Sequence, residues 1–433
     1  MQKPCLRNTI SVLDADVHQH WQMWDNHCME KFTGLLNRFL DYTACDTMSI
    51  PALVGKERPT SEGQEKLLLH LKAELEAMGL SVYYGEEKVL MGRLDGNAEG
   101  KCVAFMAHVD TADDVPGNNV KARVWREYDG SDIVLDGVSI ERKDNPDLES
   151  YIGGTIITSD GKTLLGADDK AGVAIIMESL SYLVSHPEIR HPDIEVFFTP
   201  DEETGSGMLS FPYKRMKSSV CYTFDGGREG EVETECFNGA DVNFSIHGTV
   251  CHFGAARGRM HNALTAAAAI IAALPASESP EATDGRYGYY CPDMLEGTAG
   301  EAKLSVIIRD FSNDGFEHRI KALQTLAESV SILNGVTIET SVAISYRNMA
   351  EGNNKHPEAM EAVFKAAQRL AMPLERNIIR GGTDGAMLAA NGIASPNLFT
   401  GAHNMHSLTE WVALESMEKG VDLMLAIIEE MLL

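Results

Sequence analysis

The chain has 433 residues, of which 44% are hydrophobic and 23% are charged, an ordinary composition for a globular protein. Its 37 Lys and Arg against 64 Asp and Glu give a formal net charge of −27, and such a surface repels nucleic acid and anionic lipid, whose phosphates are bound by clustered cations. We therefore expect no nucleic-acid and no membrane partner. The length exceeds one ordinary hydrophobic core and predicts two domains.

The cysteines and the N-terminus indicate the compartment. Eight cysteines occur without a CxxC pair, which predicts reduced thiols and a cytoplasmic location. No stretch of about 18 apolar residues occurs, so no membrane span is expected. The first 28 residues lack the apolar core and cleavage site of a secretory signal, and we expect residues 1–28 to be a disordered extension.

Apolar periodicity in the first half of the chain predicts alternating helices and strands. The expected elements are a helix at 60–80 with Ser61 and Gln64 as a capping box, a buried strand at 102–110, a helix at 168–186, and strands at 194–200 and 220–227. This alternation predicts an α/β domain with a mainly parallel central sheet and helices on both faces.

From about residue 237 the pattern changes to a smaller α+β unit of roughly 110 residues, large enough for its own core. Its expected elements are strands at 240–248, 303–311 and 336–346 and helices at 262–276 and 316–335. After residue 350 the α/β pattern returns, with helices at 358–371 and from about 410. We therefore expect a main domain built from 29–236 and 348–433, with 237–347 inserted into it.

Imidazole and carboxylate side chains recur just beyond the carboxyl ends of the expected strands or at the start of a helix. These residues are His108, Asp110, Asp168, Glu202, Glu203, Asp225 and His406. In open α/β sheets this edge binds ligands, so separate segments would deliver these groups to one rim. Two histidines and at least three carboxylates without cysteine are typical of a hydrolytic metal site that accepts zinc, manganese or cobalt.

The adjacent Glu202 and Glu203 are best explained by different functions. Glu203 would bind a cation, and Glu202 would take a proton from a water whose pKa the cation lowers toward ~7. Asp168, in "GADDKAG", is placed to bridge two metals, and Asp110 to orient the imidazole of His108. Each motif alone also fits a solvated loop, a helix N-cap or a turn; their shared position at one edge favours the metal site.

The segments "AHVDTADD", "TSDGKTLLGADDKAG", "TPDEE", "FDGG", "IRGGTDGA" and "NLFTG" occur in this order. With them the chain, from about Met29 onward, resembles the co-catalytic zinc exopeptidases of the aminoacylase/carboxypeptidase type. The resemblance implies a catalytic α/β domain that carries two Zn²⁺, with Co²⁺ or Mn²⁺ as substitutes, and an inserted α+β lid. It implies one zinc on His108, Asp168 and Asp225, and the other on Asp168, Glu203 and His406.

The resemblance also implies hydrolysis of the N-terminal peptide bond of short peptides, above all tripeptides, by a hydroxide that bridges the two zinc ions. Glu202 matches the general base and Asp110 the residue that is active beside it. Arg380 is expected to bind the terminal carboxylate of the substrate, and His252 to steady the carbonyl oxyanion. Related enzymes often dimerise through the lid, so a homodimer is expected as well.

Two other functions fit the same motifs. One is a dipeptidase or an N-acyl amino acid deacylase of the same fold. The other is a catalytically inactive peptide-binding protein, which should have lost a ligand or the glutamate. Two departures from the family pattern bear on the site: "CHFG" stands around His252 where His-Pro-Gly is expected, and His403 replaces an aromatic residue three positions before His406. His403 could compete for metal, or support the site, or be structural.

Overall fold

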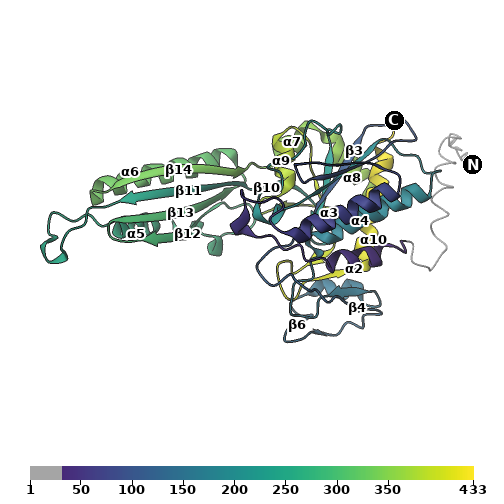
Figure 1. Ribbon diagram of the computed structural model, residues 1–433, viewed down its shortest axis with the longest axis horizontal. Helices are drawn as coiled ribbons and strands as arrows, with labels where there is room; N and C mark the ends of the chain where they lie inside the picture. The colour runs from purple at the N-terminus through teal and green to yellow at the C-terminus, as the bar shows by residue number, and fades with distance from the viewer. Residues whose placement is uncertain (1–31) are drawn as a thin grey trace, which may run out of the picture.

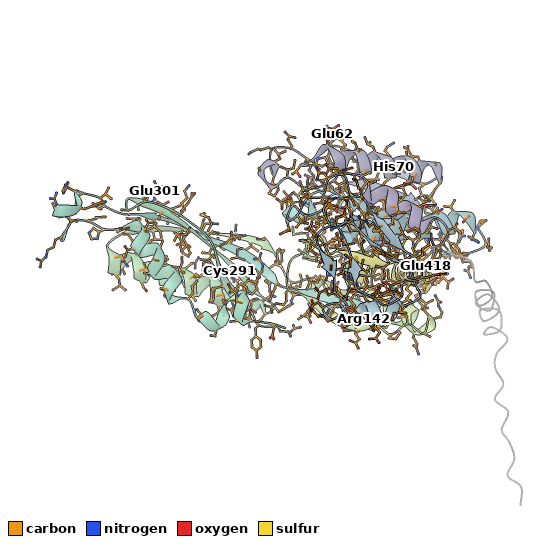
Figure 2. The ribbon with its side chains drawn as sticks, turned by 90° about the horizontal axis from the view of Figure 1, so that it is seen from below. Glu62, His70, Arg142, Cys291, Glu301 and Glu418 are labelled. Carbon is orange, nitrogen blue, oxygen red and sulfur yellow. The ribbon has the colours of Figure 1, made fainter. Side chains whose placement is uncertain are left out.

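The computed structural model describes residues 32–433, so the expected extension at 1–28 lies outside the described residues. A larger α/β part carries both ends of the described chain, and a smaller part extends from it beyond β10 (Glu231–Cys236) (Figure 1). A view turned by 90° shows the same separation, with Cys291 and Glu301 on the smaller part and Arg142 and Glu418 on the larger one (Figure 2).

An eight-stranded sheet forms the centre of the larger part, in the order β1-β2-β8-β3-β9-β16-β10-β15. Its other strands are β1 (Ser81–Tyr84), β2 (Leu90–Leu94), β3 (Val103–His108), β8 (Ile194–Thr199), β9 (Cys221–Gly226), β15 (Glu375–Ile379) and β16 (Asn397–Phe399). The four inner strands β8, β3, β9 and β16 are parallel, which confirms the mainly parallel sheet. The antiparallel pairs β1–β2, β2–β8 and β10–β16 lie toward its margins.

Helices cover both faces of this sheet. They are α2 (Leu35–Thr43), α3 (Glu62–Ala77), α4 (Ala167–Ser185), α8 (Pro357–Arg369) and α10 (Leu414–Glu430) on one face, and α9 (Asp384–Ala390) with α7 (Ala350–Lys355) beside it on the other. Successive residues of β3 point to opposite faces of the sheet. Phe105 packs on the face that α2, α3, α4, α8 and α10 cover, and Met106 packs on the other face with Leu388 of α9.

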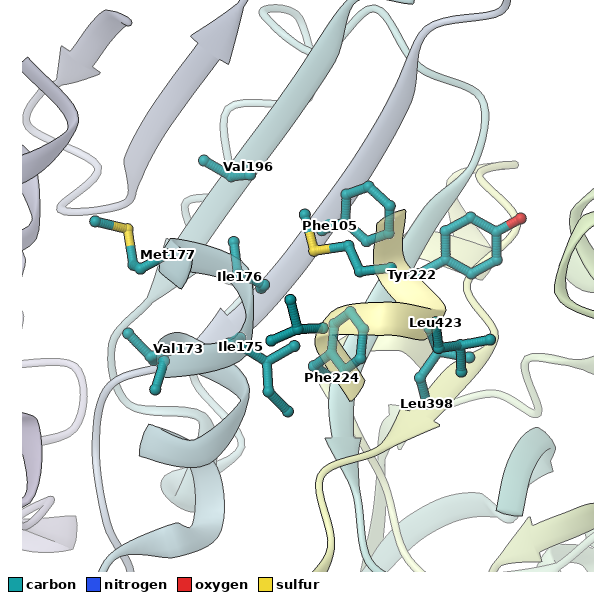
Figure 3. Close-up of a cluster of buried hydrophobic side chains, with 14 of the residues drawn as sticks. Phe105, Val173, Ile175, Ile176, Met177, Val196, Tyr222, Phe224, Leu398 and Leu423 are labelled. Atoms are coloured by element: carbon teal, nitrogen blue, oxygen red, sulfur yellow. The ribbon is translucent and has the colours of Figure 1, made fainter. Parts of the chain in front are cut away.

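The close approach of α4 to the sheet depends on one glycine. A Cβ atom on Gly172 would lie 2.0 Å from the carbonyl oxygen of Phe224 in β9, so only glycine lets the helix pack this closely. Figure 3 shows the cluster near this contact, in which Ile175 and Ile176 of α4 lie toward Phe105 and Phe224 of the sheet. The packing fixes where the start of α4 stands relative to the ends of β3 and β9.

A second, smaller sheet in the larger part has the strand order β17-β18-β7-β4. Its strands are β4 (Arg123–Trp125), β7 (Ile156–Thr158), β17 (Ala402–His403) and β18 (Trp411–Ala413), and β5 (Ile133–Val134) with β6 (Ser139–Ile140) forms a hairpin near it. The pairing of β18 with β7 joins the C-terminal region to the middle of the chain.

The smaller part has its own sheet and its own core. The sheet has the order β12-β13-β11-β14, with β11 (Asn238–His247), β12 (Tyr289–Gly297), β13 (Glu301–Asp310) and β14 (Thr337–Tyr346). Helices α5 (Ala263–Ala273) and α6 (Asn313–Asn334) pack on it around Phe244, Val306 and Phe316. Strand β12 was not predicted, because most of its residues are exposed and a bulge follows Pro292.

The predicted capping box at the start of α3 is wrong. Ser61 is the N-cap residue but makes no side-chain hydrogen bond. The side chain of Gln64 instead reaches Asp201, with Nε2 donating to Oδ1 over 2.9 Å and Oε1 accepting from the backbone N–H over 3.0 Å. Gln64 is fully buried, so both ends of its amide need partners, and the carboxylate and the backbone N–H of Asp201 provide them.

Two further findings bear on the expected compartment. The six cysteines that lie in the described chain are free thiols. Within residues 32–433 no helix combines the length and the apolar character that crossing a membrane requires. The cytoplasmic location stays a prediction.

Candidate metal centre

The strand order brings the candidate side chains to one edge of the main sheet. β3 ends at His108, β9 carries Asp225, and β8 leads into the short helix η3 (Glu202–Thr204). These three strands are adjacent and parallel, so their carboxyl ends meet at the same edge. Asp168 arrives there at the start of α4, and His406 comes from the loop between β17 and β18.

The first group of ligand atoms centres on His108. Its Nε2 atom lies 3.0 Å from Oδ1 of Asp168 and 3.3 Å from Oδ1 of Asp225. The imidazole is buried, whereas both carboxylates keep partial exposure toward the rim. One nitrogen and two oxygen atoms therefore converge on a single point.

The second group centres on His406. Its Nε2 atom lies 3.4 Å from Oδ2 of Asp168 and 3.2 Å from Oε2 of Glu203. Asp168 thus turns one oxygen toward each imidazole. Among the described residues, these are the two groups of histidine and carboxylate whose ligand atoms lie within 4.8 Å of one another.

The residues present fit two divalent cations. Oε1 of Glu203 is buried and has no hydrogen-bond partner among residues 32–433, and an unpaired buried carboxylate oxygen is costly unless a cation compensates it. Burial raises the pKa of Glu203 to about 7, and it also raises the pKa of Asp225. Contacts with Asp168 and Glu203 raise the pKa of His406 to about 11, so the cluster attracts positive charge.

Asp110 connects the imidazole of His108 to the turn that carries Glu202 and Glu203. Its Oδ1 lies 3.3 Å from Nδ1 of His108, and its two carboxylate oxygens accept the backbone N–H groups of Glu202 and Glu203, each over 3.0 Å. Burial alone would raise the pKa of Asp110, but its hydrogen bonds to His108 and Ser49 outweigh burial and keep that pKa below its usual range.

Glu202 lies beside the first ligand group. It lines a cavity of about 10 Å³ together with His108, Asp225 and Asp384, a space close to the size that holds one water molecule. Burial raises the pKa of Glu202 well above the usual value of a glutamate. A carboxyl with a raised pKa next to a water-sized space can accept and return a proton.

Arg380 and His252 are not brought to the ligand groups. The guanidinium of Arg380 donates to the carbonyl oxygens of Gly285 and Thr283 in the smaller part, over 2.6 and 3.2 Å. The loop after β11 lies at the far end of the smaller part (Figure 1). His252, in this loop, is exposed, and its Nδ1 accepts from the N–H of Gly254.

His403 belongs to neither ligand group. Its ring stacks on Trp411, with centroids 4.0 Å apart and planes 4° from parallel, and its Nδ1 atom lies 3.8 Å from Asp147. Burial lowers the pKa of His403 to about 4. Of the three roles considered for His403, these contacts fit the structural one.

Sequence reasoning missed two side chains that support the edge. Oδ1 of Asn397 accepts the backbone N–H of Asp225 over 3.1 Å, and its Nδ2 donates to Glu233 over 2.7 Å. Asp384 accepts a hydrogen bond from the hydroxyl of Thr199 over 2.7 Å. The signal that could have found Asn397 is a polar residue inside an otherwise apolar run, "SPNLF".

Comparisons with known proteins show what the chain as a whole is similar to. Residues 158–430 match the model of peptidase family M20/M25/M40. Peptidase T of Clostridium novyi is 40% identical over 403 residues, which cover 92% of this chain and 98% of that protein. Peptidase T of Salmonella typhimurium is 43% identical over 91% of this chain and 98% of its own length.

Solved structures have the same fold. An aminopeptidase from Bacillus cereus superposes with a TM-score of 0.73 at 24% identity, covering 93% of this chain and 99% of that one. A tripeptidase from Staphylococcus aureus gives 0.74 at 22% identity, over 93% and 98%. A dinuclear metal-binding peptidase from Bacillus subtilis gives 0.65 at 13% identity, over 93% and 99%.

Proposed function

Because the chain belongs to peptidase family M20/M25/M40 and is related to the peptidase T enzymes, we propose that it removes the N-terminal residue from tripeptides with the help of two zinc ions. The observation that carries the proposal is the pair of ligand groups that share Asp168, with Glu202 beside one of them. A metal cofactor follows from the family and from these groups; zinc is the proposed identity.

Five residues would hold the two ions. They are His108, Asp168 and Asp225 for one ion, and Asp168, Glu203 and His406 for the other. When bound, the ions supply Lewis acidity to the scissile carbonyl and to the attacking water. Asp110 keeps Nε2 of His108 directed at its ion, because its own carboxylate lies at the Nδ1 side of the ring.

Glu202 is the proposed general base. Its buried carboxylate would take a proton from the attacking water and give it to the leaving amine. Burial raises its pKa above that of an ordinary glutamate, which makes the carboxylate a stronger acceptor for the proton of the water. The carboxylate of Asp110 accepts hydrogen bonds from the backbone N–H groups of Glu202 and Glu203, and these bonds hold the turn in which Glu202 lines the cavity and Glu203 contacts His406.

We further propose that residues 237–347 act as a lid and that the remainder of 29–433 is the catalytic domain. Arg380 would exchange its carbonyl partners in the lid for the terminal carboxylate of the peptide, which a guanidinium can bind with two N–H groups. His252 would reach the oxyanion only if the lid closes or if the lid of a second copy approaches. A homodimer through the lid is proposed on this ground.

A substrate panel tests the proposal. Di-, tri- and tetrapeptides of alanine and an N-acetylated tripeptide are incubated with the enzyme, and the products are identified by mass spectrometry. We expect free alanine from the tripeptide above all, none from the blocked peptide, loss of cleavage after chelation, and recovery with Zn²⁺, Co²⁺ or Mn²⁺. Sedimentation of the same sample reports the oligomeric state.

Other outcomes would overturn it. Release of the acyl group from N-acyl amino acids without peptide cleavage would make the protein a deacylase. Preference for dipeptides would make it a dipeptidase. Peptide binding without turnover in the fully metal-loaded protein would identify the chain as a catalytically inactive peptide-binding protein.

A further inference from the structure

The carboxylate of Glu410 contacts the loop that presents Asp168. Its Oε2 atom accepts the backbone N–H groups of Leu165 and Gly166 over 2.6 and 2.8 Å, and its Oε1 atom accepts the N–H of Asp168 itself over 3.1 Å. The side chain is 1% exposed. Three charge-assisted hydrogen bonds to one carboxylate make a strong and directional connection.

The loop that Glu410 binds needs such a connection. It passes through Gly166 in a left-handed conformation, with φ of +79°, and places Asp168 at the start of α4 before the helix has regular geometry. Its amide groups are buried and would otherwise lack acceptors, and an unpaired buried N–H is destabilising. The neighbouring ammonium of Lys170 is also buried and donates to the carbonyl oxygen of Cys45 over 2.8 Å.

Glu410 also belongs to the segment that carries a ligand. It lies four residues after His406, in the loop between β17 and β18, whereas Asp168 is 242 residues away in the sequence. One short segment therefore supplies the imidazole of the second ligand group and the carboxylate that holds the residue shared by both groups.

We propose that Glu410 is a positioning residue that fixes the Asp168 loop against the His406 segment and so sets the spacing of the two ligand groups. The inference rests on the proposed two-metal function and deepens it. Because Asp168 belongs to both ligand groups, displacing its loop lowers the affinity for both ions together. Removal of a group that orients a metal ligand typically lowers metal affinity by about 10–100-fold.

The experiment compares Glu410→Gln with Glu178→Gln as a matched control. Glu178 is likewise a buried carboxylate, lies on the same helix α4, and accepts hydrogen bonds from Gly34 and Arg38 over 3.2 and 3.0 Å. Full-length wild type and both variants are stripped with a chelator and titrated with Zn²⁺ against a competing indicator. Urea unfolding of the metal-free proteins gives their stabilities, and the visible spectrum with Co²⁺ reports ligand geometry.

We expect both variants to lose stability, but only E410Q to lose affinity, by about 10–100-fold for both ions, with an altered cobalt spectrum. Wild-type affinity in E410Q, or equal weakening in E178Q, would overturn the proposal. Should E410Q fail to fold, Gly166→Ala replaces it: the new Cβ would lie 3.3 Å from Thr111 and strain the same loop while the carboxylate stays. Wild-type affinity in G166A would then overturn it. Failure of the wild type to bind two ions would instead refute the proposed function.

Discussion

Asp110 accepts a hydrogen bond from the backbone N–H of Glu202, with 3.0 Å between nitrogen and Oδ1. The same carboxylate lies 3.3 Å from Nδ1 of His108. One buried group thus fixes an imidazole at the end of β3 and the backbone of the turn after β8. The side chain of Glu202 lines the cavity beside His108.

Replacing Glu202 by glutamine should remove the proton carrier and leave the ligand groups intact. We expect a fall in kcat of about 10²–10⁴-fold with metal content unchanged, measured by peptide assay and by elemental analysis of the same sample. Glu281→Gln, an exposed change in the smaller part, serves as the control. Turnover near that of the wild type would place the base on another residue.

Arg380→Lys tests the carboxylate clamp. Lysine keeps the charge but not the planar pair of donors, so KM for a tripeptide should rise about ten-fold, the equivalent of ~1.4 kcal/mol. The same tripeptide with a C-terminal amide has no carboxylate to bind, and its kinetics should change little. An equal effect on acid and amide would show that Arg380 acts only through its contacts with Gly285 and Thr283.

Asp114 should orient the second imidazole. Its Oδ2 lies 3.1 Å from Nδ1 of His406, on the side of the ring opposite the ligand atom, and its side chain is 60% exposed. Asp114→Asn should lower the affinity for one of the two ions by less than about ten-fold, because solvent screens the interaction of an exposed pair. Asp113→Asn removes the same charge one residue away; if it weakens metal binding equally, net charge rather than orientation explains the effect. Zinc competition at low and high salt measures both.

Gly172→Ala should push α4 away from β9. The added methyl would meet the Phe224 carbonyl oxygen at 2.0 Å, and overpacking of this kind costs about 1–3 kcal/mol of unfolding free energy. Because α4 carries Asp168, activity should fall as well. Gly381→Ala is the matched control, since its Cβ would meet nothing closer than 3.9 Å. Equal urea midpoints for the two variants would contradict the packing argument.

His403 should make stability depend on pH. Its pKa falls from an ordinary 6.5 to about 4 in the folded chain because it is buried. Above pH ~6.5 the ring is neutral in both states; as pH falls from there toward 4, the unfolded chain binds a proton that the folded chain refuses, so the stability is lost over this range.

His403→Phe keeps a ring on Trp411 and removes this titration. Between pH 7 and pH 5 the unfolding free energy of the variant should therefore fall less than that of the wild type, by up to about 1.4 kcal/mol for each pH unit below the ordinary pKa. Urea denaturation at several pH values measures the two slopes. Parallel slopes would mean that the ring of His403 titrates alike in both states.

Much of this architecture was predictable from local patterns. The amphipathic run at 168–186 became α4 and the apolar run at 194–200 became β8, because periodicity reports which faces a segment can bury. The capping box of α3 and strand β12 were mispredicted or missed for the opposite reason. Gln64 found a partner 137 residues away, and β12 is held mainly by pairing with β13 rather than by an apolar face of its own.

The sequence by itself determined which residues could bind a cation or carry a proton, since donor atoms are a property of side chains, and it placed them at the ends of strands. Only the tertiary structure decided that β8, β3, β9 and β16 lie side by side, which brings His108 and Asp225 into one ligand group and places Glu203 in the other, with Asp168 shared between them. It also decided that Glu410 holds the Asp168 loop and that Arg380 binds the smaller part. These contacts join segments far apart in the chain, and the free energy that selects among such pairings comes from the packing of the whole core rather than from any local pattern.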